Sequence, residues 1–489
     1  MRLMKVAEKG AETGMMRRRH RRWLRAASLG IGGLMVMTMA TGRGQASAIP
    51  LRGVIEGFYG TPWQEAQRLD ILDFCRSQQL NAYIYAPKDD PWHRERWREP
   101  YPAEKLQDLA QLVKRAKSDN VQFIFAVSPG LDLAFAGEAG REDRAAMLEK
   151  LERMYQLGVR DFAIFFDDIQ QQDGAQQAAF LNAIRQELYA RHQDLGVFLT
   201  VPTEYFYQDM VTADGQRKPY TDAFARNLDP RIFVLYTGAG VVPPGITDEA
   251  LRQAEMLYGR PLGIWWNYPV NDYLESKLAL GPVTDLPREG DIPAIFFNPM
   301  KYEALSKIAL ATGAAYARSP QAYDPERAWQ QAIAEQYGSL HEDMARFAAH
   351  SQHLENDWAK IGRPDGEALR QKTEALLQDW PDSATEERLA AVSEELQILQ
   401  ASCRRLQQGL PQEVRDECRP QLLQFRRILT ADETALSLLR AKKAGQSGEQ
   451  IALHRSLRAQ YGKIKQEETT ARLSESSGVA FLARVLALP

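Results

Sequence analysis

The amino-acid sequence predicts an α/β fold, a (β/α)8 TIM barrel over residues 49–317 followed by an all-α helical bundle domain over residues 318–489. Two observations carry this prediction. Short apolar runs recur roughly every 30 to 40 residues in the first part, which is the repeat of strand–helix units. Beyond about Arg318 the composition shifts to Glu, Gln, Arg, Ala and Leu, and β-branched residues become scarce.

Eight apolar runs are candidates for the barrel strands. Most are nearly continuous, which is typical of parallel strands buried on both faces. Eight strand–helix units imply closure into a barrel. The rival is an open doubly wound sheet, but no Gly-x-Gly-x-x-Gly turn follows the first strand. The candidate strands are Gly53–Tyr59, Asn81–Pro87, Gln122–Ser128, Asp161–Asp168, Val197–Pro202, Ile232–Gly238, Leu262–Asn267 and Ala294–Asn298.

Helical patterns separate these runs. Thr61–Gln64 is typical of a helix start, with Thr61 as the N-cap, proline at the first helical position and a capping-box glutamine. After residue 318 the periodicity predicts a bundle of longer helices, and no internal repeat indicates a solenoid. This region is either structural or a binding surface for a protein partner that the sequence does not identify. The predicted helical segments are Asp324–Tyr337, Leu340–Gly362, Thr385–Leu410 and Pro411–Ala444.

The N-terminal segment predicts export. A cluster of arginines between Arg17 and Arg25 precedes an uncharged, mostly apolar run from Ala26 to Ala40, and small residues at Ala46–Ala48 resemble a cleavage site. This pattern is typical of a secretory signal peptide, here residues 1–48. A stable membrane anchor is the weaker interpretation, because about 20 apolar residues are needed to span a bilayer. We therefore expect a periplasmic or secreted protein.

Composition and charge exclude several classes of partner. The chain has 489 residues, 44% of them hydrophobic, and a net charge of −3. Nothing in this balance indicates nucleic acid or an anionic membrane surface as a partner. The three cysteines are Cys75, Cys403 and Cys418, and they lack zinc-site spacing. A Cys403–Cys418 disulfide and two inert buried thiols are both open.

Polar side chains gather where the predicted strands end. In a (β/α)8 barrel this edge carries the active site. The set is rich in carboxylates, amides and aromatic rings, which suit sugar hydroxyls and the apolar face of a pyranose. It comprises Lys88–Asp90, Asp167-Asp168, Thr203–Tyr205, Tyr236-Thr237, Trp265–Asn267, Asp272 and Asn298.

A metal site is disfavoured in the barrel. Between Ile49 and Met300 the only histidines are His93 and His192, and no histidine cluster with ligand spacing exists. A Gly-x-Ser-x-Gly nucleophile elbow is also missing from the sequence. We expect neither a metal nor a cofactor.

The adjacent carboxylates Asp167 and Asp168 are the most informative pair. An Asp pair in a loop is usually just solvated, but this one ends the apolar run Phe162–Phe166. Two such carboxylates repel, so one pKa is expected to rise, which suits a general acid. Retaining glycosidases of the usual kind place their two carboxyls across the sugar, about 5–5.5 Å apart. Neighbours on one strand end fit substrate-assisted hydrolysis better, in which the acetamide oxygen of the substrate attacks the anomeric carbon.

Eight motifs follow one another along the predicted barrel, and they are Arg52–Trp63, Tyr83–Asp90, Phe166–Ile169, Pro202–Tyr205, Tyr236–Gly238, Trp265–Tyr273, Leu278–Pro282 and Asn298–Met300. Taken together and in this order, they resemble glycoside hydrolase family 84. This family contains O-GlcNAcases, bacterial β-N-acetylglucosaminidases and proteins once called hyaluronidases. The resemblance covers the whole predicted barrel and, less distinctly, the helical region.

The resemblance implies roles for the matching residues. Asp167 would orient and polarise the acetamide, and Asp168 would be the general acid and then the base. Tyr205, Thr237 and Trp265 would enclose the acetamide. The full set of substrate-binding positions that the resemblance implies is Gly57, Lys88, Tyr205, Thr237, Trp265, Asn267, Asp272 and Asn298, with Asp272 on the outer sugar hydroxyls.

The implied function is that of a retaining exo-β-N-acetylglucosaminidase, similar to O-GlcNAcases, working through an oxazoline intermediate. Its partner would be an N-acetylglucosamine-containing glycan or glycoconjugate. Two alternatives stay open for the site: an endo-acting, hyaluronidase-like hydrolase of amino-sugar polymers, and a non-catalytic amino-sugar-binding protein. A third is an interaction protein that acts through its helical region.

Overall fold

The computed structural model describes residues 48–488, apart from residues 171–172, 379 and 383–384. The predicted signal peptide, residues 1–48, lies outside the described residues except for Ala48. Within the described part of the chain, no helix is both long and apolar enough to cross a bilayer.

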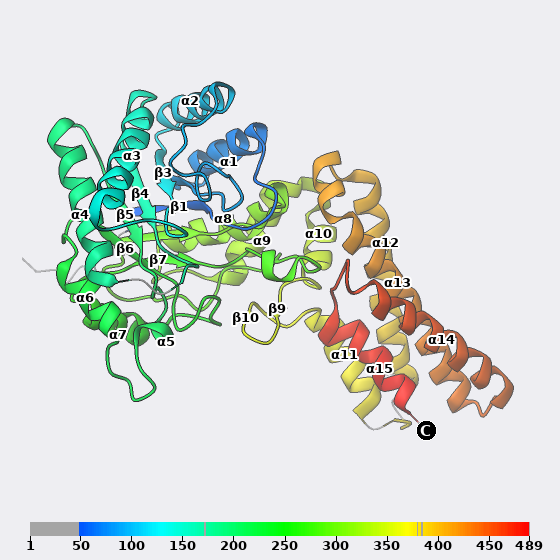
Figure 1. Ribbon diagram of the computed structural model, residues 1–489. Coiled ribbons are helices and arrows are strands. Elements are labelled where there is room, and N and C mark those ends of the chain that lie inside the picture. Colours follow the sequence, from blue (N-terminus) through cyan, green and yellow to red (C-terminus); the bar gives the residue numbers. More distant parts are fainter. Residues whose placement is uncertain (1–47, 171–172, 379, 383–384, 489) are drawn as a thin grey trace, which may run out of the picture. The chain divides into compact units, whose positions relative to one another are not determined.

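Eight parallel strands close into a barrel, as the sequence predicts. Each strand pairs with the next in the chain, and the last returns to the first, with Val54 opposite Phe297. The strands are shorter than the apolar runs, so that the last residues of most runs become loops at the barrel mouth (Figure 1). They are β1 (Leu51–Glu56), β2 (Ala82–Tyr85), β3 (Gln122–Val127), β4 (Asp161–Phe165), β5 (Phe198–Val201), β6 (Phe233–Tyr236), β7 (Gly263–Trp266) and β8 (Ala294–Phe297).

Helices cover the outside of the barrel. The first begins at Glu65, not just after Thr61, because Gln64 is its N-cap and the Gln67 side chain accepts the Gln64 N–H. The helices are α1 (Glu65–Ser77), α2 (Ala103–Ser118), α3 (Gly137–Gln156), α4 (Gly174–Arg191), α5 (Tyr207–Met210), α6 (Pro219–Asn227), α7 (Asp248–Tyr258) and α8 (Glu303–Arg318).

Alternation along the strands divides the apolar core into two layers. In β4, Ala163 and Phe165 point into the barrel, while Phe162 and Ile164 pack against the helices outside. The inner layer is filled with side chains, so the barrel is a packed core and not a pore. Polar side chains at the strand ends can therefore meet only above this layer.

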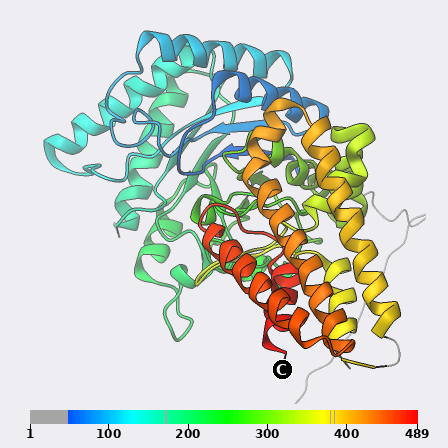
Figure 2. The same ribbon diagram turned by 90° about the vertical axis from the view of Figure 1, so that its right-hand side faces the viewer.

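The C-terminal region is mainly helical, as predicted (Figure 2). The described residues form one compact unit, so the domain boundary at residue 318 stays a prediction. Among the described residues Cys403 and Cys418 are free, buried thiols. The helices are α9 (Pro325–Tyr337), α10 (His341–Ala348), α11 (Glu367–Gln378), α12 (Thr385–Gly409), α13 (Gln412–Lys443), α14 (Ser447–Glu467) and α15 (Ala480–Ala487).

The single helix predicted over Leu340–Gly362 is wrong. The helix α10 ends at Ala348, and a two-stranded antiparallel hairpin follows, β9 (Leu354–Glu355) and β10 (Lys360–Ile361). The Asn356 side chain accepts the N–H groups of Trp358 and Ala359 at 3.1 and 2.8 Å. Such local bonds stabilise a turn in competition with the helix.

Helix α13 contacts the barrel at the N-terminus of α8. The Glu417 carboxylate accepts the Ala304 and Leu305 N–H groups at 3.2 and 2.9 Å. These are two of the donors that a helix start leaves without an internal partner. Burial nevertheless raises the pKa of Glu417 to about 7, although these N–H groups act in the opposite direction.

The raised pKa of Glu417 predicts a pH-dependent stability. Between its unfolded value near 4.5 and about 7, the native state binds more protons than the unfolded state, so this contribution to stability is lost as the pH rises. In the wild type, the unfolding free energy should fall between pH 5 and pH 8 in part because of Glu417. In Glu417→Gln this fall should be smaller by about 2 kcal/mol, as measured by urea denaturation at the two pH values. Equal slopes in the wild type and the variant would contradict this assignment.

Candidate active site

The ten residues to which the family resemblance assigns a role all lie on one cavity of about 470 Å³. It opens at the end of the barrel where the strands reach their carboxyl termini, and residues from seven of the eight strand ends or following loops line it. Their individual roles stay predictions. The ten are Asp167, Asp168, Gly57, Lys88, Tyr205, Thr237, Trp265, Asn267, Asp272 and Asn298. The other members of the predicted strand-end set do not line the cavity, namely Asp89, Asp90, Thr203, Glu204, Tyr236 and Trp266.

Asp167 is a buried carboxylate with one oxygen occupied. Its Oδ2 forms an ion pair with Lys88, whose side chain is also buried. Its other oxygen, Oδ1, is buried and has no hydrogen-bond partner among the described residues. A buried polar atom without a partner costs free energy. This oxygen is therefore suited to accept an N–H group from a molecule that enters the cavity.

Asp168 sits between two phenol groups. The Tyr59 hydroxyl donates to its Oδ2 and the Tyr205 hydroxyl to its Oδ1, each at 2.8 Å. Burial acts to raise the pKa of Asp168, but the charge of Lys88 and these hydrogen bonds outweigh it, so the pKa lies below the ordinary value. The pKa rise expected from carboxylate repulsion therefore does not occur at Asp168, because hydroxyl donors and a cation stabilise its charge.

The backbone of Asp168 is in the left-handed region, with φ of 56°. Few residues other than glycine adopt it, although aspartate tolerates it better than most. One Arg94 nitrogen donates to the Asp168 carbonyl at 3.1 Å, and another donates to the Tyr59 hydroxyl at 2.6 Å. Arg94 thus braces both the backbone of Asp168 and the phenol that holds its side chain.

Three amide groups form a chain along another wall of the cavity. The Gly57 N–H donates to Asn298 Oδ1 at 3.2 Å, and Asn298 Nδ2 donates to Asn267 Oδ1 at 3.0 Å. The Trp265 indole donates to the same Asn267 oxygen at 2.8 Å, and Asn267 Nδ2 donates to the Val241 carbonyl at 2.9 Å. These bonds hold the side chains in place before any ligand arrives.

Glycine is required at position 57 by a close approach. A Cβ there would lie 2.5 Å from the Trp265 ring. Any larger residue would displace this ring, which also packs against Phe165 with 5.6 Å between the ring centroids. Gly57 and Trp265 therefore shape the cavity as a pair.

Asp272 and Thr237 complete the predicted set. The Tyr59 N–H donates to Asp272 Oδ2 at 2.8 Å, and burial, with the charge of Asp168, raises the pKa of Asp272. The Thr237 hydroxyl donates to the Gly240 carbonyl at 2.9 Å, so its oxygen remains an acceptor toward the cavity.

Sequence reasoning missed several residues of the site. Tyr59 lies inside a motif that carries the family resemblance, but the sequence does not show that its hydroxyl reaches Asp168. Trp358 comes from the β9–β10 hairpin, is 56% exposed and packs on Tyr273 with 5.0 Å between the ring centroids. Trp358 was not expected at the cavity because the sequence predicts a helix over Leu340–Gly362. The further lining residues are Val201, Val241, Val242 and Val270.

The arrangement can perform acid–base chemistry beside a bound amide. One carboxylate offers a free acceptor, its neighbour can exchange a proton, and aromatic and valine side chains surround them. Within the described residues, no group of three His, Cys, Asp or Glu side chains could hold a metal ion.

Two family models match the chain. One, described as β-N-acetylglucosaminidase, matches residues 52–349, and the other, described as hyaluronidase post-catalytic domain-like, matches residues 368–482. The first alone spans more than half of the 489 residues.

Two curated proteins are similar over about half of this chain. It is 37% identical to protein O-GlcNAcase of Rattus norvegicus and 36% identical to that of Mus musculus, in each case over 239 residues and 47% of this chain. The match covers 26% of each relative, so the chain spans about a quarter of their length.

Solved structures extend the similarity into the helical region. CpGH84B aligns with a TM-score of 0.85 at 35% identity, over 90% of this chain and 77% of that one. A mutant of the Thermobaculum terrenum O-GlcNAc hydrolase aligns with a TM-score of 0.80 at 28% identity, over 89% and 94%. CpGH84D, at 23% identity and a TM-score of 0.79 over 89% and 74%, shows likeness of fold alone.

The phenol contacts predict the direction in which the pKa of Asp168 moves. Tyr205→Phe removes a donor that stabilises the carboxylate, so the pKa of Asp168 should rise toward about 4, the ordinary value. Carboxyl ¹³C chemical shifts of aspartate-labelled protein, followed against pH, would measure it. Tyr236→Phe is the matched control, since the Tyr236 hydroxyl is buried without a partner among the described residues. A pKa of Asp168 that stays in place in Tyr205→Phe would refute the prediction.

Proposed function

The chain belongs to the β-N-acetylglucosaminidase family, glycoside hydrolase family 84, and on this premise we propose that it is a retaining exo-β-N-acetylglucosaminidase. It removes terminal β-linked N-acetylglucosamine, with the acetamide of the substrate as the nucleophile. The observation that carries this proposal is the unpartnered Oδ1 of Asp167, buried on the cavity next to Asp168.

In the first step Asp167 Oδ1 accepts the acetamide N–H, which increases the electron density on the acetamide oxygen. That oxygen attacks the anomeric carbon as the glycosidic carbon–oxygen bond breaks, and it forms an oxazoline ring that keeps its nitrogen-bound proton, hydrogen-bonded to the Asp167 carboxylate. Asp168 gives its proton to the departing oxygen. The positive Lys88 side chain stays beside Asp167 throughout and fixes its orientation.

In the second step Asp168, now ionised, takes a proton from water while the water oxygen attacks the anomeric carbon. The oxazoline opens and restores the acetamide. Two inversions at one carbon give net retention. The hydroxyls of Tyr59 and Tyr205 stabilise Asp168 in its ionised state, which is the state it occupies between the two steps.

Protonation of Asp168 before the first step requires that its pKa rises when substrate binds. A sugar that fills the cavity excludes water from Asp168 and strengthens the effect of burial, which already acts in this direction. Its glycosidic oxygen also offers an acceptor to the protonated acid.

Exo action is supported by the size of the cavity. Its volume of about 470 Å³ lies at the small end of the usual range of ligand pockets, roughly 300–1,000 Å³, and suits a single sugar ring. The exposed Trp358 at its edge offers a surface for the group to which the sugar is attached.

We further propose that the substrate is an N-acetylglucosamine-bearing glycan or glycoconjugate outside the cytoplasm. The support is the signal-peptide pattern of residues 1–48, together with the names of the curated relatives, which act on O-linked N-acetylglucosamine. The match of residues 368–482 to a hyaluronidase post-catalytic model favours endo action on a polymer as the second candidate. A chitin oligomer labelled at its reducing end separates the two, because exo action releases only the monosaccharide.

Substitution of either carboxylate should abolish most activity on an aryl β-N-acetylglucosaminide. We expect Asp167→Asn to lower kcat roughly 10²–10³-fold through lost electrostatic stabilisation. Asp168→Asn should lower it roughly 10²–10⁴-fold, and less for leaving groups that need no proton. Asp173→Asn is the matched control, because Asp173 caps α4 outside the cavity. Full activity of the double variant Asp167→Asn/Asp168→Asn would exclude this mechanism.

The acetamide itself can be tested with a set of substrates. The N-trifluoroacetyl analogue has a less nucleophilic oxygen, so its hydrolysis should slow sharply, and the aryl β-glucoside, which lacks the amide, should not be cleaved. Initial rates for the three aryl glycosides at one concentration suffice. Equal rates on glucoside and N-acetylglucosaminide would mean that the acetamide takes no part.

A further inference from the structure

The loop between β7 and β8 links the cavity to the C-terminal region. This segment, the 268–281 loop, carries Asp272 and Tyr273 on the cavity. A few residues on, the completely buried Lys277 forms ion pairs with Asp365, at 3.1 Å, and with Glu475. Both carboxylates belong to the C-terminal region. Asp365 lies just before α11, and Glu475 lies after α14.

Backbone hydrogen bonds reinforce this junction. The Arg472 N–H donates to the Ser276 carbonyl at 2.8 Å, and the Leu280 N–H donates to the Ser351 carbonyl at 2.8 Å. The Ser351 hydroxyl donates to the Leu278 carbonyl at 2.9 Å. The second half of the 268–281 loop, from Ser276 to Leu280, is therefore hydrogen-bonded to the C-terminal region at several positions.

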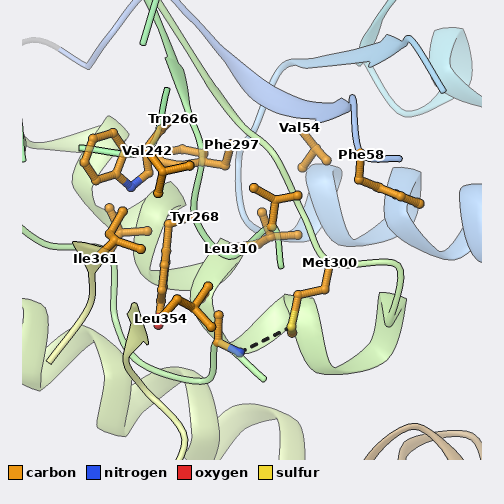
Figure 3. Packing of buried hydrophobic residues seen from close by; sticks show 14 of the residues in the cluster. Val54, Phe58, Val242, Trp266, Tyr268, Phe297, Met300, Leu310, Leu354 and Ile361 are labelled. Atoms are coloured by element: carbon orange, nitrogen blue, oxygen red, sulfur yellow. Dashed lines mark hydrogen bonds between the residues drawn. The ribbon is translucent and has the colours of Figure 1, made fainter. Parts of the chain in front are cut away.

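Asp365 organises a second part of the site. It accepts the N–H groups of Gln352 and His353 at 2.8 and 3.2 Å, immediately before the hairpin that carries Trp358. The Tyr268 hydroxyl donates to the Gln352 carbonyl at 3.1 Å. Figure 3 shows Leu354 and Ile361, from the two strands of this hairpin, packed beside Tyr268.

Within the loop, the backbone of Lys277 is hydrogen-bonded to Asn271 and Leu274, which lie on either side of Asp272. The Lys277 carbonyl accepts from Asn271 Nδ2 at 2.6 Å, and the Lys277 N–H donates to the Leu274 carbonyl at 2.9 Å. The Leu274 N–H in turn donates to the Asn271 carbonyl at 2.8 Å. Asp272 lies inside this compact turn, and its Oδ2 accepts the Tyr59 N–H at 2.8 Å.

A buried lysine is a costly way to fill space. Desolvation of an ammonium group offsets much of the energy of its ion pairs, and an apolar side chain of similar volume often stabilises as well. Unlike an apolar contact, an ion pair requires one defined arrangement of its two groups. Here the ion pairs of Lys277 join the 268–281 loop to the C-terminal region. We propose that Lys277 is a positioning residue, which acts through its ion pairs with Asp365 and Glu475 to hold Asp272 and Tyr273 on the cavity. The inference rests on the proposed function, together with the role in binding outer sugar hydroxyls that the family resemblance implies for Asp272.

A double-mutant cycle tests whether Lys277 acts through Asp272. We expect Lys277→Met to lower kcat/KM on an aryl β-N-acetylglucosaminide about 10–100-fold, mainly through KM, as is usual for residues that orient a contact group. In the Asp272→Asn background the same substitution should cost less than about threefold, because the contact it positions is already lost. A purely structural role predicts that the two losses multiply, and that result would overturn the proposal.

Glu475→Gln covers the case in which Lys277→Met does not fold. Its side chain is 29% exposed, and its loss leaves the Lys277–Asp365 pair intact. Glu475→Gln should also lower kcat/KM less in the Asp272→Asn background than in the wild type, although both losses should be smaller than those caused by Lys277→Met. Glu417→Gln is the control, because Glu417 joins α13 to α8 without a hydrogen bond to the 268–281 loop among the described residues.

Amide hydrogen exchange of the 268–281 loop gives a readout without substrate. Exchange should be faster in Lys277→Met and Glu475→Gln than in the wild type, and unchanged in Glu417→Gln. Unaltered exchange of this loop in both Lys277→Met and Glu475→Gln would refute the positioning role, whatever substrate the enzyme cleaves. A wild-type protein that cleaves no aryl glycoside would refute the proposed function instead, and the exchange result would still decide the role of Lys277.

Discussion

Closure of the barrel between β8 and β1 is the constraint on which the site depends. Val54 pairs with Phe297 in this register, so the residues after the two strands, Gly57 and Asn298, meet at 3.2 Å although 241 positions separate them. Because every strand runs in the same direction, all the polar residues that follow strands emerge at one end. The packed inner layer below them, with Phe165 and Trp265 in contact, gives this end a solid floor.

Two adjacent carboxylates have different environments because their neighbours differ. Asp167 pairs with a cation and has one oxygen without a hydrogen-bond partner among the described residues, whereas both oxygens of Asp168 accept phenol hydrogen bonds. The left-handed backbone of Asp168 turns its side chain toward Tyr59 and Tyr205, and Arg94 holds this conformation. Local strain of this kind survives only where several contacts determine it, and such places are commonly functional sites.

The strand ends and nine of the ten cavity residues could be predicted because each signal is local, whereas Gly57 was indicated only by the family resemblance. An apolar run marks a strand, and the polar residue that follows it marks the barrel mouth, as at Asp167 and Asn298. Contacts between distant segments left no such signal. The pKa of Asp168 is lowered by phenols and a lysine from other loops, whereas the order of residues along the chain indicates only the repulsion between Asp168 and its neighbour Asp167. The helical composition of residues 340–362 predicts a helix at Trp358. The turn that Asn356 closes with its side chain could not be recognised from this one residue, so Trp358 was not expected at the cavity.

The helical region therefore contributes more than a covering for the barrel. On the barrel side, the loop that carries Asp272 is bonded through the Tyr59 N–H, which Asp272 accepts, and through the Val270 N–H, which donates to the Asn298 carbonyl at 2.9 Å. On its other side, bonds come from Ser351, Asp365 and Glu475, all beyond the last barrel helix. Asp365 also accepts the Gln352 and His353 N–H groups just before the hairpin of Trp358, so one buried ion-pair cluster contacts both the loop of Asp272 and the segment that leads to Trp358. The helical region is thereby bonded to two segments that line the cavity.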